Sequence, residues 1–319
     1  MIKKIGVLTS GGDAPGMNAA IRAVTRSALN LGLEVYGIHD GYLGLYENNI
    51  EKMHPRSVSE KMGHGGTFLG TARLKEFTEY EVRKVAVQNL EALGIDAIVA
   101  IGGDGTYRGA LALSKMGIPI VCLPGTIDND IAGTDYCIGF DTALNTVVEA
   151  VDKLRDTSNS HRRCSIVEVM GRNSGDIAIW TAIATGAEVV ICKETGYNRE
   201  EVLDTIRKAA LSKRHAIIIL AENMIPIQEL AQIVSANTAF DARATVLGHV
   251  QRGGAPSAKD RVLASEMGVR AVRALLEGDN HHCICDRNGK LISAPIEEVL
   301  AEDDSIQTME KYEVFKLVQ

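Results

Sequence analysis

Three short apolar runs in the first half of the chain each end in a glycine-containing turn. The runs span residues 4–9, 96–101 and 118–123, and the turns that follow them are Ser10–Gly16, Gly102–Thr106 and Pro124–Asp130. Short apolar runs bounded by turn signals are typical of strands buried on both faces of a parallel sheet. In open α/β sheets, ligands bind outside the carboxyl ends of such strands. The sequence therefore predicts an α/β fold with ligand binding at these turns.

Apolar runs alternate with helical patterns along the rest of the chain, which is typical of a parallel sheet with crossover helices. We expect strands at residues 4–9, 33–38, 95–101, 118–123, 164–170, 187–192, 215–221 and 243–248. We expect helices at residues 17–30, 78–93, 106–116, 140–157, 175–185, 199–211, 227–236 and 258–277. The expected fold is α/β, with two doubly wound αβα domains of mainly parallel strands.

Composition limits the classes of function. The chain has 319 residues, more than a typical single domain, so two domains are expected. Its net charge of −7 and its aromatic content of 4% disfavour nucleic acid as a partner. No apolar run in the sequence has the length of a membrane span, and the six cysteines lie mostly in strand-like runs, as in reduced proteins. We therefore expect a cytoplasmic protein with no nucleic-acid or membrane partner.

Two carboxylates lie close together in the turn at 124–130. Asp128 and Asp130 flank Asn129, whereas a turn uses at most one such side chain to bind its own backbone. The excess indicates chemistry, and it makes Asp128 a candidate general base. The alternative for Asp128 is a structural carboxylate within the turn.

The turn at 102–106 has the features of a phosphate site. Glycines between a strand and a helix let backbone N–H groups approach a phosphate, with the positive end of the helix dipole behind them. Asp104 lies among these glycines, and a carboxylate near phosphate oxygens requires a bridging cation such as Mg²⁺. A tight turn with a solvated Asp104 is the alternative, because short motifs of this kind also occur by chance.

Together these turns resemble those of the bacterial ATP-dependent 6-phosphofructokinases, and the resemblance extends along nearly the whole chain. The matching segments, in order, are residues 8–13, 17–20, 65–73, 102–106, 124–130, 169–172 and 247–254. Each is weak alone, but their order and spacing are specific. The resemblance implies two domains of the phosphofructokinase type. A larger ATP-binding domain would comprise residues 1–138 and 252–305, and a smaller sugar-phosphate-binding domain residues 139–251 and 306–319.

The resemblance also implies a reaction, the committed step of glycolysis. The γ-phosphoryl group of ATP would pass to the 1-hydroxyl of fructose 6-phosphate, giving fructose 1,6-bisphosphate and ADP. Asp128 would be the base that takes the hydroxyl proton. Thr126, Gly12 and Arg172 would contact the transferring group, because N–H and guanidinium donors stabilise its charge.

Matching positions imply further contacts with the substrates. Mg²⁺ would bind Asp104 and, through water, Asp130. The residues implied at ATP are Gly12, Arg73, Leu74, Gly103, Asp104, Gly105 and Thr106. Those implied at fructose 6-phosphate are Thr126, Ile127, Asp128, Arg163, Met170, Gly171, Arg172, Glu222, Arg243, His249, Val250, Gln251 and Arg252. Arg163 and Arg243 would reach the sugar phosphate of a neighbouring subunit, which implies an oligomer and, in this family, usually a homotetramer.

The resemblance implies an effector site for ADP, GDP or phosphoenolpyruvate at a subunit interface. The matching residues are Arg22, Arg26, Arg56, Ser57, Val58, Ser59, Glu60, Arg155, Glu188, Lys213, Arg214 and His215. A solvated helix face is the alternative for Arg22 and Arg26. Pro55 stands where several relatives have Arg, Glu60 replaces a shorter Asp, and the loop before Lys213 is one residue shorter. We therefore expect an effector site that is present but weakened.

Two glycines indicate ATP rather than pyrophosphate as the donor. Pyrophosphate-using relatives carry Asp where this chain has Gly105, and Lys where it has Gly125. An Asp at position 105 would repel the α-phosphate of ATP. Two alternatives stay open, namely a kinase of the same superfamily with another acceptor, such as NAD or a lipid, and an inactive nucleotide-sensing relative.

Overall fold

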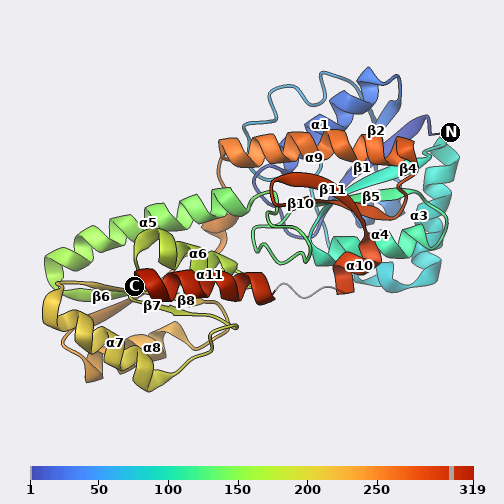
Figure 1. Cartoon of the computed structure of the whole chain (residues 1–319). Helices are drawn as coiled ribbons and strands as arrows, with labels where there is room; N and C mark the ends of the chain where they lie inside the picture. The colour runs from blue at the N-terminus through green and yellow to red at the C-terminus, as the bar shows by residue number, and fades with distance from the viewer. Residues whose placement is uncertain (1, 302–304) are drawn as a thin grey trace. The chain divides into compact units, whose positions relative to one another are not determined.

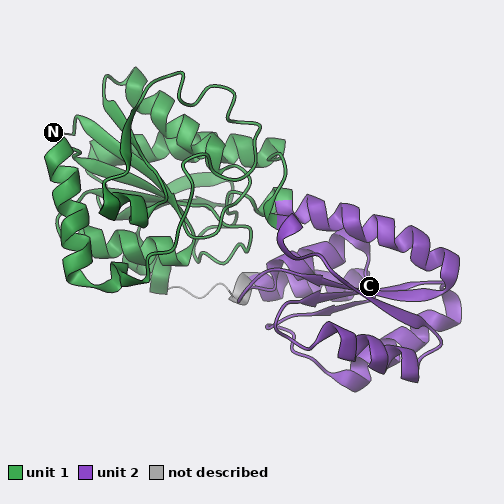
Figure 2. Ribbon diagram, turned by 180° about the vertical axis from the view of Figure 1, so that it is seen from behind, with its two compact units in different colours: residues 1–142, 252–302 green, residues 143–251, 303–319 purple. Residues whose placement is uncertain are grey.

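The computed structural model describes residues 2–301 and 305–319, which form two compact units (Figure 1, Figure 2). Unit 1 comprises Met1–Thr142 and Arg252–Glu302, and unit 2 comprises Ala143–Gln251 and Asp303–Gln319. The chain first leaves unit 1 after residue 142 rather than after the expected residue 138, and it returns at residue 252. The second expected crossing, after residue 305, adjoins residues 302–304, which lie outside the described residues.

Unit 1 is built on a seven-stranded sheet in the order β11-β10-β5-β4-β1-β2-β3. The strands are β1 (Lys4–Ser10), β2 (Glu34–Ile38), β3 (Ile50–Met53), β4 (Ala97–Gly102), β5 (Ile120–Pro124), β10 (His282–Arg287) and β11 (Lys290–Pro295). The edge strands β3 and β11 are antiparallel to their neighbours, and the other pairs are parallel. This mainly parallel sheet confirms the expected α/β class.

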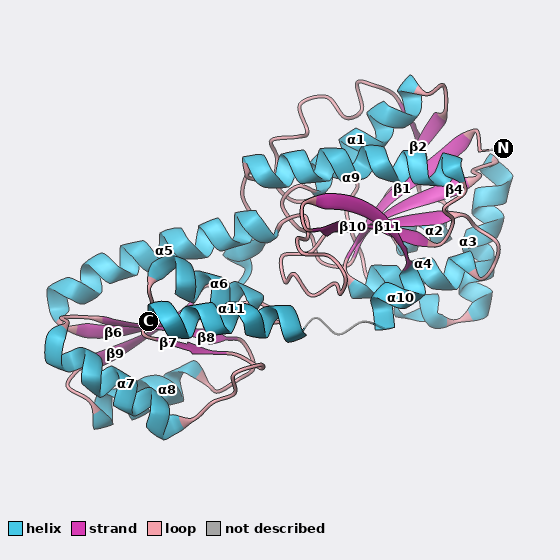
Figure 3. Ribbon diagram, viewed as in Figure 1, coloured by secondary structure: helices cyan, strands magenta, loops and turns pink. Residues whose placement is uncertain are grey.

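Helices cover both faces of this sheet (Figure 3). On one face, α1 (Met17–Asn30) packs against α9 (Ala258–Glu277). On the other lie α3 (Tyr80–Leu93), α4 (Asp104–Ser114) and α10 (Ile296–Ala301), and α2 (Tyr42–Glu47) packs against α3. Because helices cover both faces, every residue of β4 is buried, which explains why its sequence is a continuous apolar run.

The core of unit 1 holds most of the cysteines. Cys122, Cys137, Cys283 and Cys285 are fully buried in one cluster with Tyr107 of α4. Cys283 and Cys285 lie on one face of β10, with their Sγ atoms 3.7 Å apart. All six cysteines of the chain are free thiols in the structure. Burial raises the pKa of the Cys122 thiol, so this thiol stays protonated and acts as a small apolar side chain.

Unit 2 has a smaller sheet, four parallel strands in the order β7-β8-β6-β9. These are β6 (Arg163–Val169), β7 (Val189–Ile191), β8 (Ala216–Ala221) and β9 (Asp241–Val246). α5 (Phe140–His161) begins in unit 1 and continues into unit 2. α5, α6 (Asp176–Thr185) and α11 (Ser305–Val318) lie on one face of the sheet, and α7 (Arg199–Ser212) and α8 (Ile227–Asn237) lie on the other (Figure 1).

Every strand and helix that the sequence predicts is present, with ends shifted by a few residues. The sequence patterns did not predict α2, β3, the β10–β11 hairpin, α10 or α11. Two 3₁₀ helices, Lys75–Thr78 and Gly248–Arg252, were not predicted either. Among the described residues, no helix combines the length and the apolar content that crossing a membrane requires.

Candidate active site

Strand register brings the three glycine-containing turns of unit 1 to one edge of the sheet. Ser10 of β1 pairs with Gly102 of β4, and Gly102 pairs with Pro124 of β5. The three parallel strands therefore end at the same level. The connection that follows β1 leads to β2 on one side, whereas the connection that follows β4 leads to β5 on the other, so the two run in opposite directions. Ligands of open α/β sheets bind at such a switch point.

A close approach of two backbones explains the glycine at position 102. A Cβ atom there would lie 2.3 Å from the carbonyl oxygen of Ser10 and 2.3 Å from Thr106 Oγ1. The buried Thr106 hydroxyl donates to the same carbonyl at 2.9 Å. The Thr106 side chain thus links the turn after β4 to the turn after β1, and the Thr106 N–H donates to the Gly103 carbonyl at 2.9 Å.

The turn that follows β1, called the β1 turn (residues 10–16), places Gly12 beside an arginine. A Cβ atom on Gly12 would lie 3.3 Å from Nη1 of Arg252, so the guanidinium rests against the Gly12 backbone. The Thr71 hydroxyl donates to the Gly11 carbonyl at 2.8 Å, which holds the segment before Arg73 against the same turn. Arg252 therefore lies directly beside Gly12, and the segment that leads to Arg73 is held against the same turn.

Asp104 begins α4, and Arg108 binds it from one helical turn further on. Nε of Arg108 donates to Oδ2 of Asp104 and Nη2 donates to Oδ1, both at 2.9 Å. The pair is bidentate and partly exposed to solvent. A cation at Asp104 must therefore compete with Arg108. The sequence signal for this pair was available, because residues four apart face each other on a helix.

The turn after β5 is closed by its own side chains. The N–H of Asp128 donates to Thr126 Oγ1 at 3.2 Å, and only 8% of Asp128 is exposed. The Asn129 side chain accepts from Cys137 N at 2.8 Å and donates to the Asp135 carbonyl at 3.3 Å. Asn129 itself has φ of 51°, an uncommon backbone conformation that surrounding contacts must hold. The turn is therefore preorganised.

In unit 2, a second group of predicted residues follows the carboxyl ends of the strands. Met170–Arg172 follow β6, Glu222 follows β8, and the Gly248–Arg252 segment follows β9. Glu222 Oε1 accepts from the Arg172 N–H at 2.9 Å, and Gln251 Oε1 accepts from the Met170 N–H at 3.2 Å. Arg172 has φ of 56°, so these two bonds hold an unusual backbone in place.

A further carboxylate lies near Glu222. Burial raises the pKa of Glu168, the β6 residue before Val169, and the negative charge of Glu222 raises that pKa further. The carboxyl edge of unit 2 therefore carries acceptors suited to hydroxyl groups, beside donors suited to anions. His249 and Val250 are exposed at this edge, whereas Gln251 is buried.

Arg163 and Arg243 lie at the opposite side of the same sheet, towards the amino ends of its strands. Arg163 begins β6, and Arg243 of β9 pairs with Ser165. Both guanidinium groups share the Asp241 carboxylate, at 3.4 Å for Arg163 and 2.7 Å for Arg243. A strand rises about 3.3 Å per residue, so β6 separates Arg163 from Val169 by about 20 Å. These arginines therefore lie near the amino ends of the strands, whereas Glu222 lies at their carboxyl ends. The sequence patterns did not identify Asp241 as their partner.

The predicted effector residues form one group in each unit. In unit 1, Arg26 Nη2 donates to the Pro55 carbonyl at 3.0 Å, and the Ser59 hydroxyl donates to the same carbonyl at 3.2 Å. The segment 55–60 is therefore fixed to α1 through the backbone of Pro55. Arg22, Arg56, Ser57, Val58 and Glu60 lie in these same two segments.

In unit 2, Glu188 organises the effector group. Its carboxylate accepts from Lys213 Nζ at 2.7 Å and from the Ile217 N–H at 2.6 Å. Arg155 contacts His215 at 3.2 Å, and Arg214 precedes His215 in the chain. Burial lowers the pKa of His215, and the charges of Arg155 and Lys213 lower it further against the opposing effect of Glu188. His215 is therefore neutral at pH 7.

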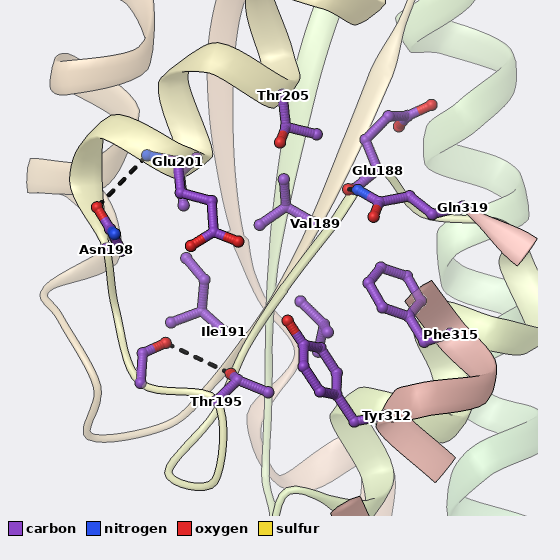
Figure 4. A pocket seen from close by; sticks show the side chains of 13 residues that line it. Glu188, Val189, Ile191, Thr195, Asn198, Glu201, Thr205, Tyr312, Phe315 and Gln319 are labelled. Atoms are coloured by element: carbon purple, nitrogen blue, oxygen red, sulfur yellow. Dashed lines mark hydrogen bonds between the residues drawn. The ribbon is translucent and has the colours of Figure 1, made fainter. Parts of the chain in front are cut away.

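A small cavity of about 70 Å³ adjoins Glu188 in unit 2 (Figure 4). The cavity is lined by Glu188, which precedes β7, by Val189 of β7, and by Tyr312 and Phe315 of α11. The side chain of Gln319 donates to the Glu188 carbonyl. The last helix of the chain is thus attached to the residue on which the predicted effector group depends.

The structure distributes the predicted residues over both units. Unit 1 contains Gly12, Arg73, Leu74, Gly103–Thr106, Thr126–Asp128, Asp130 and Arg252. Unit 2 contains Arg163, Met170–Arg172, Glu222, Arg243 and His249–Gln251. No group of three or more His, Cys, Asp or Glu side chains that would hold a metal is found within the described residues. A phosphate-bridging Mg²⁺ needs only one or two protein carboxylates, and Asp104 and Asp130 fit that requirement.

Comparisons with known proteins agree with this arrangement. The family model described as phosphofructokinase matches residues 4–275. An ATP-dependent 6-phosphofructokinase of Aliivibrio fischeri is 54% identical over 320 residues, covering 100% of this chain and 99% of that protein. One from Vibrio campbellii is 60% identical over 285 residues, covering 89% of each.

Solved structures show the same fold. A Pichia pastoris phosphofructokinase in the T-state superposes with a TM-score of 0.90 at 37% identity, and the alignment covers 100% of this chain and 37% of that one. A pyrophosphate-dependent phosphofructokinase from Marinobacter aquaeolei has a TM-score of 0.83 at 22% identity, covering 94% of this chain and 84% of that one. The latter similarity concerns the fold alone.

An α/β protein with this degree of identity to proteins named ATP-dependent 6-phosphofructokinase is a phosphotransferase. The chain belongs to the phosphofructokinase family. Kinases of this family require a metal ion, which neutralises the phosphate charges during transfer.

The pair between Asp104 and Arg108 leads to a test of metal use. In Arg108→Met, the competing guanidinium is lost while side-chain length and helix propensity are kept. We expect the Mg²⁺ concentration that gives half-maximal activity to fall by about threefold or more, in keeping with an exposed ion pair. Arg270→Met, which removes another ion-paired arginine of unit 1, is the control. An unchanged Mg²⁺ dependence in Arg108→Met would contradict a competition between Arg108 and the metal for Asp104.

Proposed function

We propose that the protein is an ATP-dependent 6-phosphofructokinase that transfers the γ-phosphoryl group of ATP to the 1-hydroxyl of fructose 6-phosphate. The observation that carries this proposal is the 54% identity over the full chain to a protein of that name. The products are fructose 1,6-bisphosphate and ADP. A coupled assay with ATP and fructose 6-phosphate tests it directly. Turnover of another acceptor, or none at all, would favour a different kinase or an inactive relative.

In this proposal, unit 1 binds ATP and supplies the base. The backbone N–H of Gly12 and the N-terminus of α4 donate to the phosphates, because the first N–H groups of a helix have no partner within it. Asp104 would hold Mg²⁺, with Asp130 as a second carboxylate for the ion, and the ion would neutralise charge on the phosphates. Asp128 accepts the proton of the 1-hydroxyl. Its turn is already closed by Asn129, so the carboxylate needs no rearrangement before it reacts.

Unit 2 recognises the sugar phosphate. Glu222 accepts hydrogen bonds from sugar hydroxyls and also holds the backbone of Arg172. Arg172 contacts the transferring phosphoryl group, for which an arginine fork is suited because it stays charged. His249 and Arg252 bind the 6-phosphate, together with Arg163 and Arg243 of a neighbouring subunit. The position of Arg163 and Arg243 at the amino edge supports a site completed by a second subunit, and we propose a homotetramer.

The space around two glycines supports ATP as the donor. A Cβ atom on Gly125 would lie 3.0 Å from Cγ2 of Ile101 and 3.2 Å from Cε of Met17, so a lysine there would require repacking. A Cβ atom on Gly105 would meet no atom within 4 Å. Position 105 therefore discriminates by charge rather than by volume, because any side chain there has room.

We propose that residues 22, 26, 56–60, 155, 188 and 213–215 contribute to an effector site for ADP, GDP or phosphoenolpyruvate at a subunit interface, and that this site is weakened. Pro55 has no N–H and no side-chain donor, and its carbonyl accepts from Arg26. One arginine is thus directed to the backbone of the segment. Lys213 is paired with Glu188, and His215 is neutral. The site therefore has only a moderate positive charge with which to bind an anionic effector.

Asp128→Ser tests the base. We expect kcat to fall by about 10²–10⁴-fold, because general base catalysis supplies a factor of this size, while the KM for both substrates changes little. Asp128→Asn, which keeps the shape of the side chain and removes its basicity, is expected to show the same loss in the coupled assay. A fall of less than about tenfold in both variants would exclude Asp128 as the base.

Gly105→Asp tests the donor. The side chain has room, so the carboxylate is expected to raise the KM for ATP by electrostatic repulsion with little loss of folding stability. Gly105→Asn has the same size without the charge and is expected to use ATP nearly as well as the native enzyme. Pyrophosphate should not support turnover of the native protein. If both variants show the same rise in the KM for ATP, side-chain volume rather than charge governs this position.

Pro55→Arg tests the effector site. The substitution adds a donor and keeps the carbonyl that binds Arg26 and Ser59. A charge-assisted bond to a phosphate contributes about 1.5 kcal/mol or more, so we expect ADP and phosphoenolpyruvate to act at about tenfold lower concentration. Fructose 6-phosphate saturation curves at several effector concentrations measure this, with Pro55→Ala as control. A native enzyme that already responds at micromolar effector, together with no change in Pro55→Arg, would contradict the weakening.

A further inference from the structure

Asp260 is a fully buried carboxylate of unit 1 that lies outside the predicted site. It is in the first turn of α9 and is 0% exposed. Its Oδ1 accepts from the Gly139 N–H at 3.0 Å. Its Oδ2 accepts from the Thr142 N–H at 2.9 Å and from the Thr142 hydroxyl at 2.5 Å. A buried charge is retained only where such bonds compensate for its lost hydration, so these three bonds define its place.

The segment that Asp260 binds is the far end of the turn that carries Asp128. Ile138, the residue before Gly139, forms a parallel bridge with Gly125. Its N–H donates to the Pro124 carbonyl at 2.8 Å, and its carbonyl accepts from the Thr126 N–H at 3.1 Å. Thr126 in turn accepts from the Asp128 N–H. A continuous series of hydrogen bonds therefore runs from the Asp260 carboxylate to the backbone of Asp128.

The same carboxylate lies where the β1 turn packs on this segment. A Cβ atom on Gly139 would lie 2.7 Å from Cβ of Ala14, and one on Gly16 would lie 2.7 Å from Cγ2 of Ile138. Both glycines have left-handed φ, 109° for Gly139 and 103° for Gly16. The backbone of each segment thus packs directly on a side chain of the other, Gly139 on Ala14 and Gly16 on Ile138, so a shift of one segment displaces the other.

The N-termini of α5 and α9 reinforce this attachment reciprocally. Ser257 caps α9, its hydroxyl accepting from the Asp260 N–H at 3.2 Å and donating to Asp141 at 2.6 Å. The Ser257 N–H donates to the Thr142 hydroxyl at 2.9 Å. Each helix start therefore binds the other, with Asp260 as the central acceptor. Burial raises the pKa of the Asp260 carboxyl, and the bonds from Thr142 and Gly139 oppose this rise.

We propose that Asp260 is a positioning residue for phosphoryl transfer, which sets the place of the Asp128 turn relative to the β1 turn through Gly139 and Thr142. This role rests on the proposed function of Asp128. Asp260 touches no substrate in this arrangement. Its effect on rate comes from geometry, since a displacement of about 1 Å at a reacting group costs up to about a hundredfold in rate.

Asp260→Asn is the first test. The amide keeps the volume and one acceptor for Gly139, but its NH₂ group faces the N–H and hydroxyl of Thr142. We expect kcat to fall about tenfold or more, with the KM for ATP and for fructose 6-phosphate changed by less than about twofold. Asp279→Asn, at the other end of α9 and partly exposed, is the control and should keep native kinetics. Equal losses in kcat and in substrate affinity would overturn the proposal.

Hydrogen exchange measured on folded Asp260→Asn distinguishes a positioning role from a general loss of stability. We expect the Thr126, Ile138 and Gly139 amides to exchange about tenfold faster or more, while amides of β6 and β8 in unit 2 keep their native rates. Uniform acceleration, or unchanged exchange at Thr126 and Ile138, would overturn the proposal. If Asp260→Asn does not fold, Thr142→Val removes one bond to Oδ2 and keeps the backbone donor, and the same two readouts apply to it.

The two proposals fail in different ways. If Asp128→Ser keeps its turnover, Asp128 is not the base, yet the exchange rates of Thr126 and Ile138 still report whether Asp260 holds the turn. If Asp128→Ser loses turnover and Asp260→Asn keeps both turnover and exchange rates, only the role of Asp260 is refuted.

Discussion

The structure depends on the register that places Ser10, Gly102 and Pro124 side by side. Because these residues end three adjacent parallel strands, a shift of any strand would separate the turns that follow. The contact that holds the register leaves no room for a side chain at position 102, where the Ser10 carbonyl and the Thr106 hydroxyl meet. Backbone N–H groups and the start of α4 therefore converge on one place, and an anion there is stabilised by dipoles that need not reorganise.

Much of this arrangement was predictable because the deciding interactions are local. The runs that form β1, β4 and β5 are apolar throughout, since helices cover both faces of the sheet. Their turns carry glycine where backbones approach or φ is positive. The sequence patterns predicted that β9 begins at residue 243, two residues after its observed start. This edge strand begins with alternating charged and apolar residues, and the charges of Asp241 and Arg243 obscured its start.

Other features could not be predicted from local patterns. α11 packs against α6, more than a hundred residues earlier in the chain, and such long-range packing overrides propensity. The bonds that Asp260 makes to Gly139 and Thr142 are equally remote in sequence. The β10–β11 hairpin is a different case, because Asn288 and Gly289 have φ of 54° and 72°, and Asn-Gly is a strong hairpin signal. That signal was present in the sequence and was missed.

Unit 2 presents two sets of cations at opposite ends of one sheet, which bears on the homotetramer that we propose. The carboxyl edge offers Arg172 with Glu222, whereas Arg163 and Arg243 project from the amino end of the strands with Asp241 between them. A small sugar phosphate does not span a distance of about 20 Å, so the two sets serve one substrate only if different copies of the chain supply them. Asp241 then keeps two like charges together in the absence of a phosphate, and a phosphate that binds both arginines must take over that neutralisation. Substrate binding and subunit association would in this way be linked through a single carboxylate.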